Sequence, residues 1–352
     1  MDPMFTPDRD QPDAARLDSL GETLATIAAR TAHEGPWRSG AFGALGESGV
    51  LAGFVPVDCG GTGASEPALV SALIAIAERC LTTALALTQW AAAVRIISGA
   101  SADVRGSLLP PLARGDASTT VGISHLTTSR RHLGTPAVAA FPDGAGWRLD
   151  GFCPWVTGAD SSDTIVTGAV TANDGQMFFV VPTDTAGVTI DPPLSLLALS
   201  GSRTSAVRFE AARPAHAIPP PGGGPRTGGL ATTALAVGAT RASIAAIARE
   251  GQSRPGLMPI AAEFTAEIDD LTARLLRGAR EGIDANDRDR LRVMTNGLVV
   301  RAAQGALTAS KGAGFVAGHT VERLVRESLF FLVWSCPQAV SDAVLCDLAG
   351  ID

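Results

Sequence analysis

The sequence lacks the features of a nucleic-acid-binding protein. It has 352 residues and no tyrosine, and its 28 lysine and arginine residues are outnumbered by 35 aspartate and glutamate residues. The formal net charge is −7, whereas proteins that bind nucleic acid present basic surfaces to phosphate. No basic run is longer than the pair Arg130-Arg131. We therefore expect no nucleic-acid partner.

Disulfide, targeting and membrane signals are also missing. The five cysteines are scattered without C-x-x-C spacing, and the first residues lack the apolar stretch of a signal peptide. Reduced thiols in the cytosol are the simplest interpretation, so we predict a cytoplasmic protein. No apolar run approaches the ~18 residues of a membrane span. The sequence therefore predicts no membrane-spanning helix.

Three common kinds of catalytic site lack their sequence signals. The five histidines lie far apart, without an H-x-x-x-H pair or a carboxylate cluster, which disfavours a metal site. No G-x-G-x-x-G follows an expected strand, so a nicotinamide-dinucleotide site is not indicated. The pair Gly201-Ser202 does not form the Gly-x-Ser-x-Gly turn of a serine hydrolase.

A short β region stands in the middle of the sequence. Residues 146–167, GWRLDGFCPWVTGADSSDTIVT, read as two strands with a turn or kink at Asp150-Gly151. Apolar, β-branched runs of this kind need a sheet to pack on. Further strand-like runs supply one at residues 136–141, 176–181 and 205–209.

Helical periodicity dominates both sides of this β region. Before it, the helical runs are residues 14–32, 42–51, 66–99 (with a hint of a break near Cys80) and 102–114. After it, a Pro- and Gly-rich stretch at 218–229 indicates a linker or surface loop. The helical runs that follow are residues 229–250, 260–275, 291–305, 320–334 and 338–348.

This order predicts an α+β fold. Long helices with Ala- and Gly-rich faces pack closely, as in a four-helix bundle. The expected domains are an N-terminal helical domain (1–118), a central small β-barrel or sheet domain (119–217) and a C-terminal four-helix bundle (218–352).

Four segments in this order resemble the acyl-CoA dehydrogenase family of flavoproteins. They are GESGVLAGFVPVDCGGTG (46–63), the strand pair WRLDGFCPWVT (147–157), ALSGSRTSAVRFEAA (198–212) and VERLVRE (321–327). The resemblance implies FAD between the β-domain and the bundle, and a homodimer or homotetramer. It also implies an acyl thioester substrate, on CoA or an acyl carrier protein, with an electron-transfer partner or oxygen as the acceptor.

The resemblance assigns four residues to the flavin ring. Trp155 and Thr157 match the family residues that stack on the ring and hydrogen-bond near its reactive nitrogen. Ile123 and Ser124, in GISHL, match the loop that binds the pyrimidine side of the flavin. Without the resemblance, Trp155 would be interpreted as a core aromatic and Thr157 as an edge-strand residue.

Four other residues are candidates for the rest of the cofactor. Gly312 and Gly314 resemble the family's glycine turn, where backbone approaches the dinucleotide of a neighbouring subunit. Arg249 or Arg254 would replace the family's pyrophosphate-binding arginine, whose planar fork suits a diphosphate. The alternatives are a simple helix stop for the glycines and solvated helix-end charges for the arginines.

The sequence departs from the family at the catalytic base, a Glu that takes the α-proton of the thioester. Nine residues after Arg326, where the family usually has this Glu, stands Ser335. A second family position for the Glu falls on Gly228. A serine hydroxyl without a base cannot replace a carboxylate near neutral pH.

Three hypotheses remain for the activity. The enzyme oxidises an acyl thioester with a base from elsewhere, for which Glu250, Glu327 and a thiolate at Cys336 are candidates. Glu327 is more readily explained as an ion-pair partner of Arg323, and Cys336 as a structural thiol. Alternatively, the protein is a flavin-dependent monooxygenase or oxidase, and His125 in the flavin loop then moves the proton. In the third, it is a degenerate homologue that binds flavin or a partner without turnover.

Overall fold

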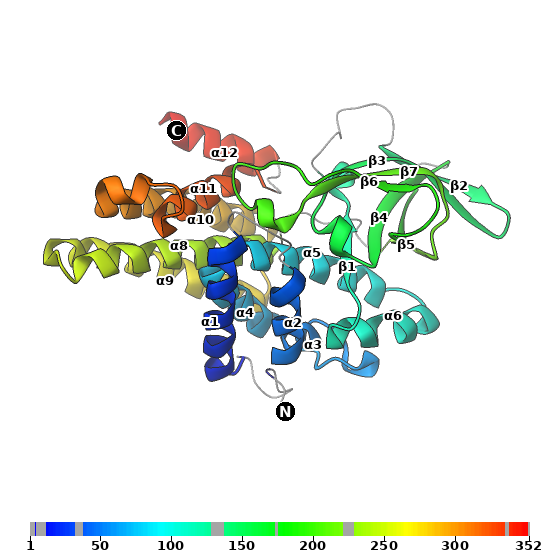
Figure 1. Ribbon diagram of the computed structural model, residues 1–352, viewed down its shortest axis with the longest axis horizontal. Helices are drawn as coiled ribbons and strands as arrows, with labels where there is room; N and C mark the ends of the chain where they lie inside the picture. The colour runs from blue at the N-terminus through cyan, green and yellow to red at the C-terminus, as the bar shows by residue number, and fades with distance from the viewer. Residues whose placement is uncertain are drawn as a thin grey trace.

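The protein folds as helices, then a sheet, then helices, which confirms the predicted fold class (Figure 1). A computed structural model describes residues 4, 12–31, 38–127, 137–172, 175–220, 229–334 and 338–350. The sheet lies at one end of the molecule, and the long C-terminal helices extend away from it (Figure 1). The described residues form two hydrophobic cores: one joins the helices to strand residues such as Val166 and Phe178, and the other lies within the sheet.

The N-terminal part is built from short and medium helices. They are α1 (Ala14–Thr31), α2 (Arg38–Ser48), α3 (Val50–Gly53), the 3₁₀ turn η1 (Val57–Cys59), α4 (Glu66–Arg79), α5 (Leu81–Ser98) and α6 (Ala102–Arg114). The expected helix over 66–99 is two helices, because Cys80 adopts an extended backbone with φ −151° and ψ 97°. The side chain of Ser65 caps α4 by accepting a hydrogen bond from the Ala68 amide.

The described strands form one sheet in the order β6-β7-β3-β2-β4-β5-β8, with β1 added in parallel to β4. They are β1 (Thr119–Gly122), β2 (Val138–Asp143), β3 (Gly146–Val156), β4 (Thr164–Thr171), β5 (Gln176–Pro182), β6 (Val188–Ile190), β7 (Ser205–Ala212) and β8 (His216–Ile218). The expected kink at Asp150-Gly151 is a register shift within one continuous strand. Gly151 has φ 140°, a conformation that L side chains rarely adopt.

Three short elements lie beside or within the sheet region. They are α7 (Ser124–Thr127) and the 3₁₀ turns η2 (Ala159–Ser161) and η3 (Ser200–Ser202). The sequence reading did not include α7, η3 or the strands β1, β6 and β8. Each has only three or four residues, which is too short for periodicity to be visible.

Long helices form the C-terminal part. They are α8 (Leu230–Gly251), η4 (Pro255–Leu257), α9 (Met258–Glu281), α10 (Ala285–Ser310), η5 (Lys311–Phe315), α11 (Thr320–Ser328), η6 (Leu329–Leu332) and α12 (Gln338–Ala349). The expected helix over 320–334 ends at Ser328 and continues as η6. Helix α8 packs tightly on α4 at Gly238, where an added Cβ would overlap the backbone oxygen of Ile74.

Among the described residues, two helices are long and apolar enough to cross a membrane by length and composition alone. They are α5 and α8, and 72% and 78% of their apolar windows are buried inside the protein. Core helices that are covered by other helices have this same composition, so the observation is weak support for a span.

Candidate functional site

A large cavity lies between the N-terminal helices, the sheet, the start of α8 and the η6 segment. Its volume is about 1030 Å³. Helix α4 lines it with Glu66, Leu69 and Leu73, and α5 lines it with residues that include Leu85 and Ala92. These positions follow helical spacing, so one face of each helix forms a mostly apolar wall.

The sheet contributes four of the residues that the sequence assigned to flavin. Ile123 and Ser124 follow β1, whereas Trp155 lies near the end of β3 and Thr157 just after it, and all four line the cavity. Trp155 is 48% exposed although its neighbour Val156 is fully buried. A large ring left half uncovered on a cavity wall offers a surface for a flat ligand.

Thr157 belongs to a buried network of hydroxyl groups. Its Oγ1 lies 3.1 Å from Oγ1 of Thr204, which lies 2.9 Å from Oγ of Ser202. Thr120 donates to the backbone carbonyl of Thr157 at 2.7 Å and fixes the chain there. Thr157 and Thr204 line the cavity, whereas Ser202 is fully buried.

Residues 329–334, which comprise η6 and the two residues after it, contribute an aromatic part of the cavity wall. The rings of Phe330 and Trp334 stack with centroids 5.0 Å apart, and both line the cavity. Two buried side chains of α10 hold this segment: Asn296 donates to the carbonyl of Phe331 and Arg292 to that of Trp334, each at 2.8 Å. The candidate residues Ser335 and Cys336 follow directly and lie outside the described residues.

Charged groups are few on the cavity wall. Among its described lining residues, Glu66 is the one carboxylate, and it lies at the start of α4. Arg326 lines the cavity from α11, where it donates to the carbonyl of Leu197 at 2.9 Å. Arg326 donates a hydrogen bond to the Glu322 carboxylate, and this contact raises the pKa of Arg326 and keeps it charged.

His125 is buried but does not line the cavity in the described part of the chain. Its Nε2–H donates to the carbonyl of Gly168 at 2.8 Å, and burial lowers the pKa of the ring. The imidazole is therefore neutral near pH 7, with Nδ1 as its free acceptor. This geometry matches a structural hydrogen-bonding role.

The remaining cofactor candidates lie away from the cavity. Arg254 donates to the backbone carbonyl of Ala309 and pairs with Glu250, so it lies beside the end of α10. The turn η5, with Gly312 and Gly314, begins at that point. Among the described residues that line the cavity, none comes from this end of the bundle.

Arg249, the other arginine candidate, is exposed in the last turn of α8. It does not belong to the described lining of the cavity.

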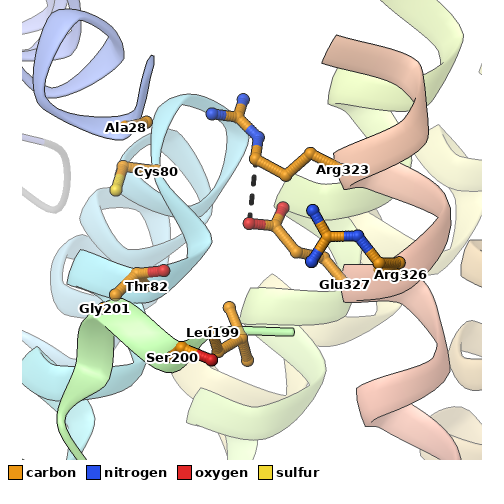
Figure 2. A pocket seen from close by; sticks show the side chains of 9 residues that line it. All are labelled: Ala28, Cys80, Thr82, Leu199, Ser200, Gly201, Arg323, Arg326 and Glu327. Atoms are coloured by element: carbon orange, nitrogen blue, oxygen red, sulfur yellow. Dashed lines mark ion pairs between the residues drawn. The ribbon is translucent and has the colours of Figure 1, made fainter. Parts of the chain in front are cut away.

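A second, small pocket surrounds Glu327 (Figure 2). It has a volume of about 20 Å³ and is lined by residues of α1, α11, η3 and the α4–α5 junction. The Glu327 carboxylate points at Arg323, whose Nε lies 3.9 Å away, and Arg326 lies beside it. This confirms the predicted pairing with Arg323. Burial raises the pKa of Glu327 to about 7 despite the two arginines.

Sequence reasoning missed three parts of the site. Glu66 directly follows the helix-capping residue Ser65. This sequence pattern predicts the start of a helix but gives no indication of a cavity. Ser202 and Thr204 stand within the quoted segment 198–212, where the alternation of small hydroxyl residues was visible. The aromatic wall of η6 was interpreted as helix, so its stacking could not be foreseen.

The chain is similar to known proteins in sequence and in fold. Residues 15–116 match the family described as acyl-CoA dehydrogenase, N-terminal domain. The chain is 25% identical to a probable acyl-CoA dehydrogenase of Bacillus subtilis, YngJ, over 88% of this chain and 90% of the relative. It is 28% identical to an L-prolyl-[peptidyl-carrier protein] dehydrogenase of Pseudomonas fluorescens over 48% of this chain and 46% of the relative.

A solved structure has the same fold. It is a glutaryl-CoA dehydrogenase of Mycobacterium smegmatis in complex with FADH2, with a TM-score of 0.77 and 20% sequence identity. The alignment covers 96% of this chain and 97% of that chain.

Proposed function

We propose, from the premise that this chain belongs to the acyl-CoA dehydrogenase family, that it binds FAD in the large cavity and oxidises an acyl thioester. The observation that carries this proposal is the convergence of Ile123, Ser124, Trp155 and Thr157 on one cavity wall. They come from segments far apart in the sequence, and the family resemblance had assigned all four to the flavin ring.

The lining residues fit a flavin ring. Trp155 supplies a half-exposed aromatic face, and Thr157 supplies a hydroxyl within a mostly apolar surface. Apolar walls with a few converging polar groups are typical of cofactor pockets. When bound, FAD would supply the two-electron acceptor of the oxidation. The chain itself would hold the ring, orient the acyl group and exclude water.

The substrate class follows from the relatives. One is named for a carrier-protein thioester and another for an acyl-CoA, so an acyl thioester on either carrier is the proposed substrate. Abstraction of the α-proton needs a base near the thioester. Glu250 and Glu327 do not belong to the described lining, whereas Glu66 does. Glu66 is therefore our candidate base in the described part of the chain.

The far end of the bundle supports an oligomer. Arg254, Gly312 and Gly314 gather away from the cavity of their own chain. We propose that they serve the cofactor of a neighbouring copy, in a homodimer or homotetramer in the cytoplasm. Size-exclusion chromatography with light scattering tests this, and a monomer that retains FAD would contradict it.

Anaerobic reduction tests the proposed activity. Purified protein loaded with FAD is mixed under nitrogen with short- and long-chain acyl-CoA, or with acyl carrier protein thioesters, while the visible flavin absorbance is followed. Bleaching by a thioester supports dehydrogenation. Oxygen uptake with reduced flavin and a hydroxylated product would instead support the monooxygenase alternative. Protein that takes up no FAD would contradict both.

Glu66→Gln tests the base with the same assay. Removing a general base lowers a rate by about 10²–10⁴-fold, so a loss of this size in the bleaching rate supports the assignment. Glu78→Gln, on the same helix but outside the described cavity lining, is the matched control. Equal rates for both variants would exclude Glu66.

A further inference from the structure

A chain of three hydroxyl groups leads from the cavity into the protein. Thr157 and Thr204 both line the cavity, with their Oγ1 atoms 3.1 Å apart, and Oγ of the fully buried Ser202 lies a further 2.9 Å away. All three are at most 9% exposed. In both hydrogen bonds either oxygen can be the donor. The direction of the whole chain is therefore not fixed by its geometry.

The backbone that carries Ser202 and Thr204 is strained. The turn η3 is flanked by Leu199 at φ 62° and Arg203 at φ 48°, two non-glycine residues in the left-handed region. Such conformations persist only where the surroundings hold them, and they cluster at functional sites. Here the holding contacts are an ion pair between Arg203 and Asp160, and a 2.9 Å hydrogen bond from the Gly158 amide to the Ser202 carbonyl.

We infer that Ser202 and Thr204 are positioning residues that let the Thr157 hydroxyl either donate or accept a hydrogen bond at the cavity wall, matched to the two redox states of the cofactor. This inference rests on the proposed function, because it takes the group in front of Thr157 to be a flavin.

The two states place opposite demands on Thr157. The reactive nitrogen of an oxidised flavin has a lone pair and accepts a hydrogen bond, whereas in the reduced flavin it carries a hydrogen and donates. With an oxidised flavin bound, Thr157 would donate outward and accept from Thr204, which would accept from Ser202. With a reduced flavin bound, each O–H would rotate to the opposite direction. No covalent bond forms or breaks, and no proton leaves its oxygen.

Removing Thr204 would affect the two states unequally. Without it, Thr157 can still donate to an oxidised flavin. When it must accept from the reduced flavin, its own O–H loses the Thr204 oxygen as an acceptor. A buried donor without a partner is costly, so the reduced form should lose affinity relative to the oxidised form.

The test measures the two-electron midpoint potential of the FAD-loaded protein and its Kd for FAD. For Thr204→Val we expect the affinity for reduced flavin to fall about tenfold more than the affinity for oxidised flavin. For a two-electron couple, this ratio makes the midpoint potential about 30 mV more negative than that of the wild type. Ser202→Ala should shift it in the same direction by less. Thr204→Ser, which restores the hydroxyl, should return the wild-type potential.

Ser205→Ala is the matched control. Ser205 is adjacent to Thr204 and fully buried, but its hydroxyl makes no hydrogen bond with Thr157, Thr204 or Ser202. We expect its potential to equal that of the wild type. If Thr204→Val does not fold, the comparison of Ser202→Ala with Ser205→Ala decides the question.

Equal potentials for Ser202→Ala, Thr204→Val and wild type, with FAD bound normally, would overturn the hydroxyl chain and leave the proposed function intact. Wild-type protein that binds no FAD would overturn both.

Discussion

In the large cavity, the buried polar groups near Trp155 are neutral hydroxyls that bond to one another. In the small pocket that shares Arg326 with it, the buried Glu327 carboxylate lies beside the partly exposed guanidinium groups of Arg323 and Arg326. Neutral hydroxyls that are paired cost little to bury, whereas charges are expensive to remove from water. The cavity can therefore receive an apolar ring at any pH near neutrality, while the small pocket depends on the protonation of Glu327.

The small pocket should make stability depend on pH, and this is the largest expected effect. In the native protein, burial raises the pKa of the Glu327 carboxyl in this pocket from its ordinary value of 4.5 to about 7. The stabilisation is therefore fully present below the ordinary pKa and is lost as pH rises through the native one. Compared with Glu327→Gln, wild type should lose roughly 2–3 kcal/mol of unfolding free energy between about pH 5 and pH 8.

Urea unfolding across this pH range checks the prediction. The exposed Glu263→Gln on α9 is the control, and we expect it to keep the pH-dependent loss of stability because it leaves Glu327 in place. Parallel profiles for wild type and Glu327→Gln would mean that Glu327 titrates normally and that the contrast between the two pockets is not electrostatic.

Trp155→Ala should weaken FAD binding in the large cavity and leave the structure of the small pocket unchanged. Stacking of a base on an aromatic side chain is worth about 1–3 kcal/mol, so the Kd for FAD should rise about tenfold or more. The melting temperature of the apo-protein should stay unchanged, since the ring is half exposed. Trp147→Phe is the control, because Trp147 lies on the same strand and packs on Phe179 in the sheet core.

His125→Phe should lower stability by about 1 kcal/mol, because the buried Gly168 carbonyl loses its donor. The Kd for FAD should stay within about twofold of the wild type, since His125 lies off the described cavity wall. Chemical denaturation and FAD titration check both parts. A variant of normal stability with impaired oxygen chemistry would instead assign His125 a catalytic role.

The smallest effect is expected at Ser335, the position where the family resemblance predicts an acid. Ser335→Ala should leave the rate of thioester-dependent flavin bleaching within about twofold, because an unassisted hydroxyl contributes little as a base. Stopped-flow absorbance measures this rate. A loss of a hundredfold would show that Ser335 takes part in the chemistry.

The fold was readable from the sequence because its long elements carry strong periodicity. Residues 102–114 and 146–156 are predicted and observed as a helix and a strand. The break at Cys80 was visible only as a hint, because α4 ends there through the extended backbone of Cys80 and not through a change in the side-chain pattern. The short strands and η3 escaped because three or four residues contain too little pattern.

The sequence predicted four residues that the structure brings to one cavity wall, whereas it did not predict the carboxylate Glu66 in the lining of that cavity. Trp155 and Thr157 belong to the segment 147–157, which resembles a family motif along its whole length. In the structure they line the cavity together with Ile123. Glu66 gave no signal, because a carboxylate at a helix start is ordinary. The hydroxyl chain joins Thr157 to Ser202, 45 residues later, and only folding of β7 beside β3 brings them together.

A crystal structure of the protein with FAD tests the central claim most directly. We expect the flavin ring to stack on Trp155, with its reactive nitrogen within hydrogen-bonding distance of the Thr157 hydroxyl. Density for the flavin elsewhere, or a cavity wall in which Trp155 has folded inward to fill the space, would contradict the account.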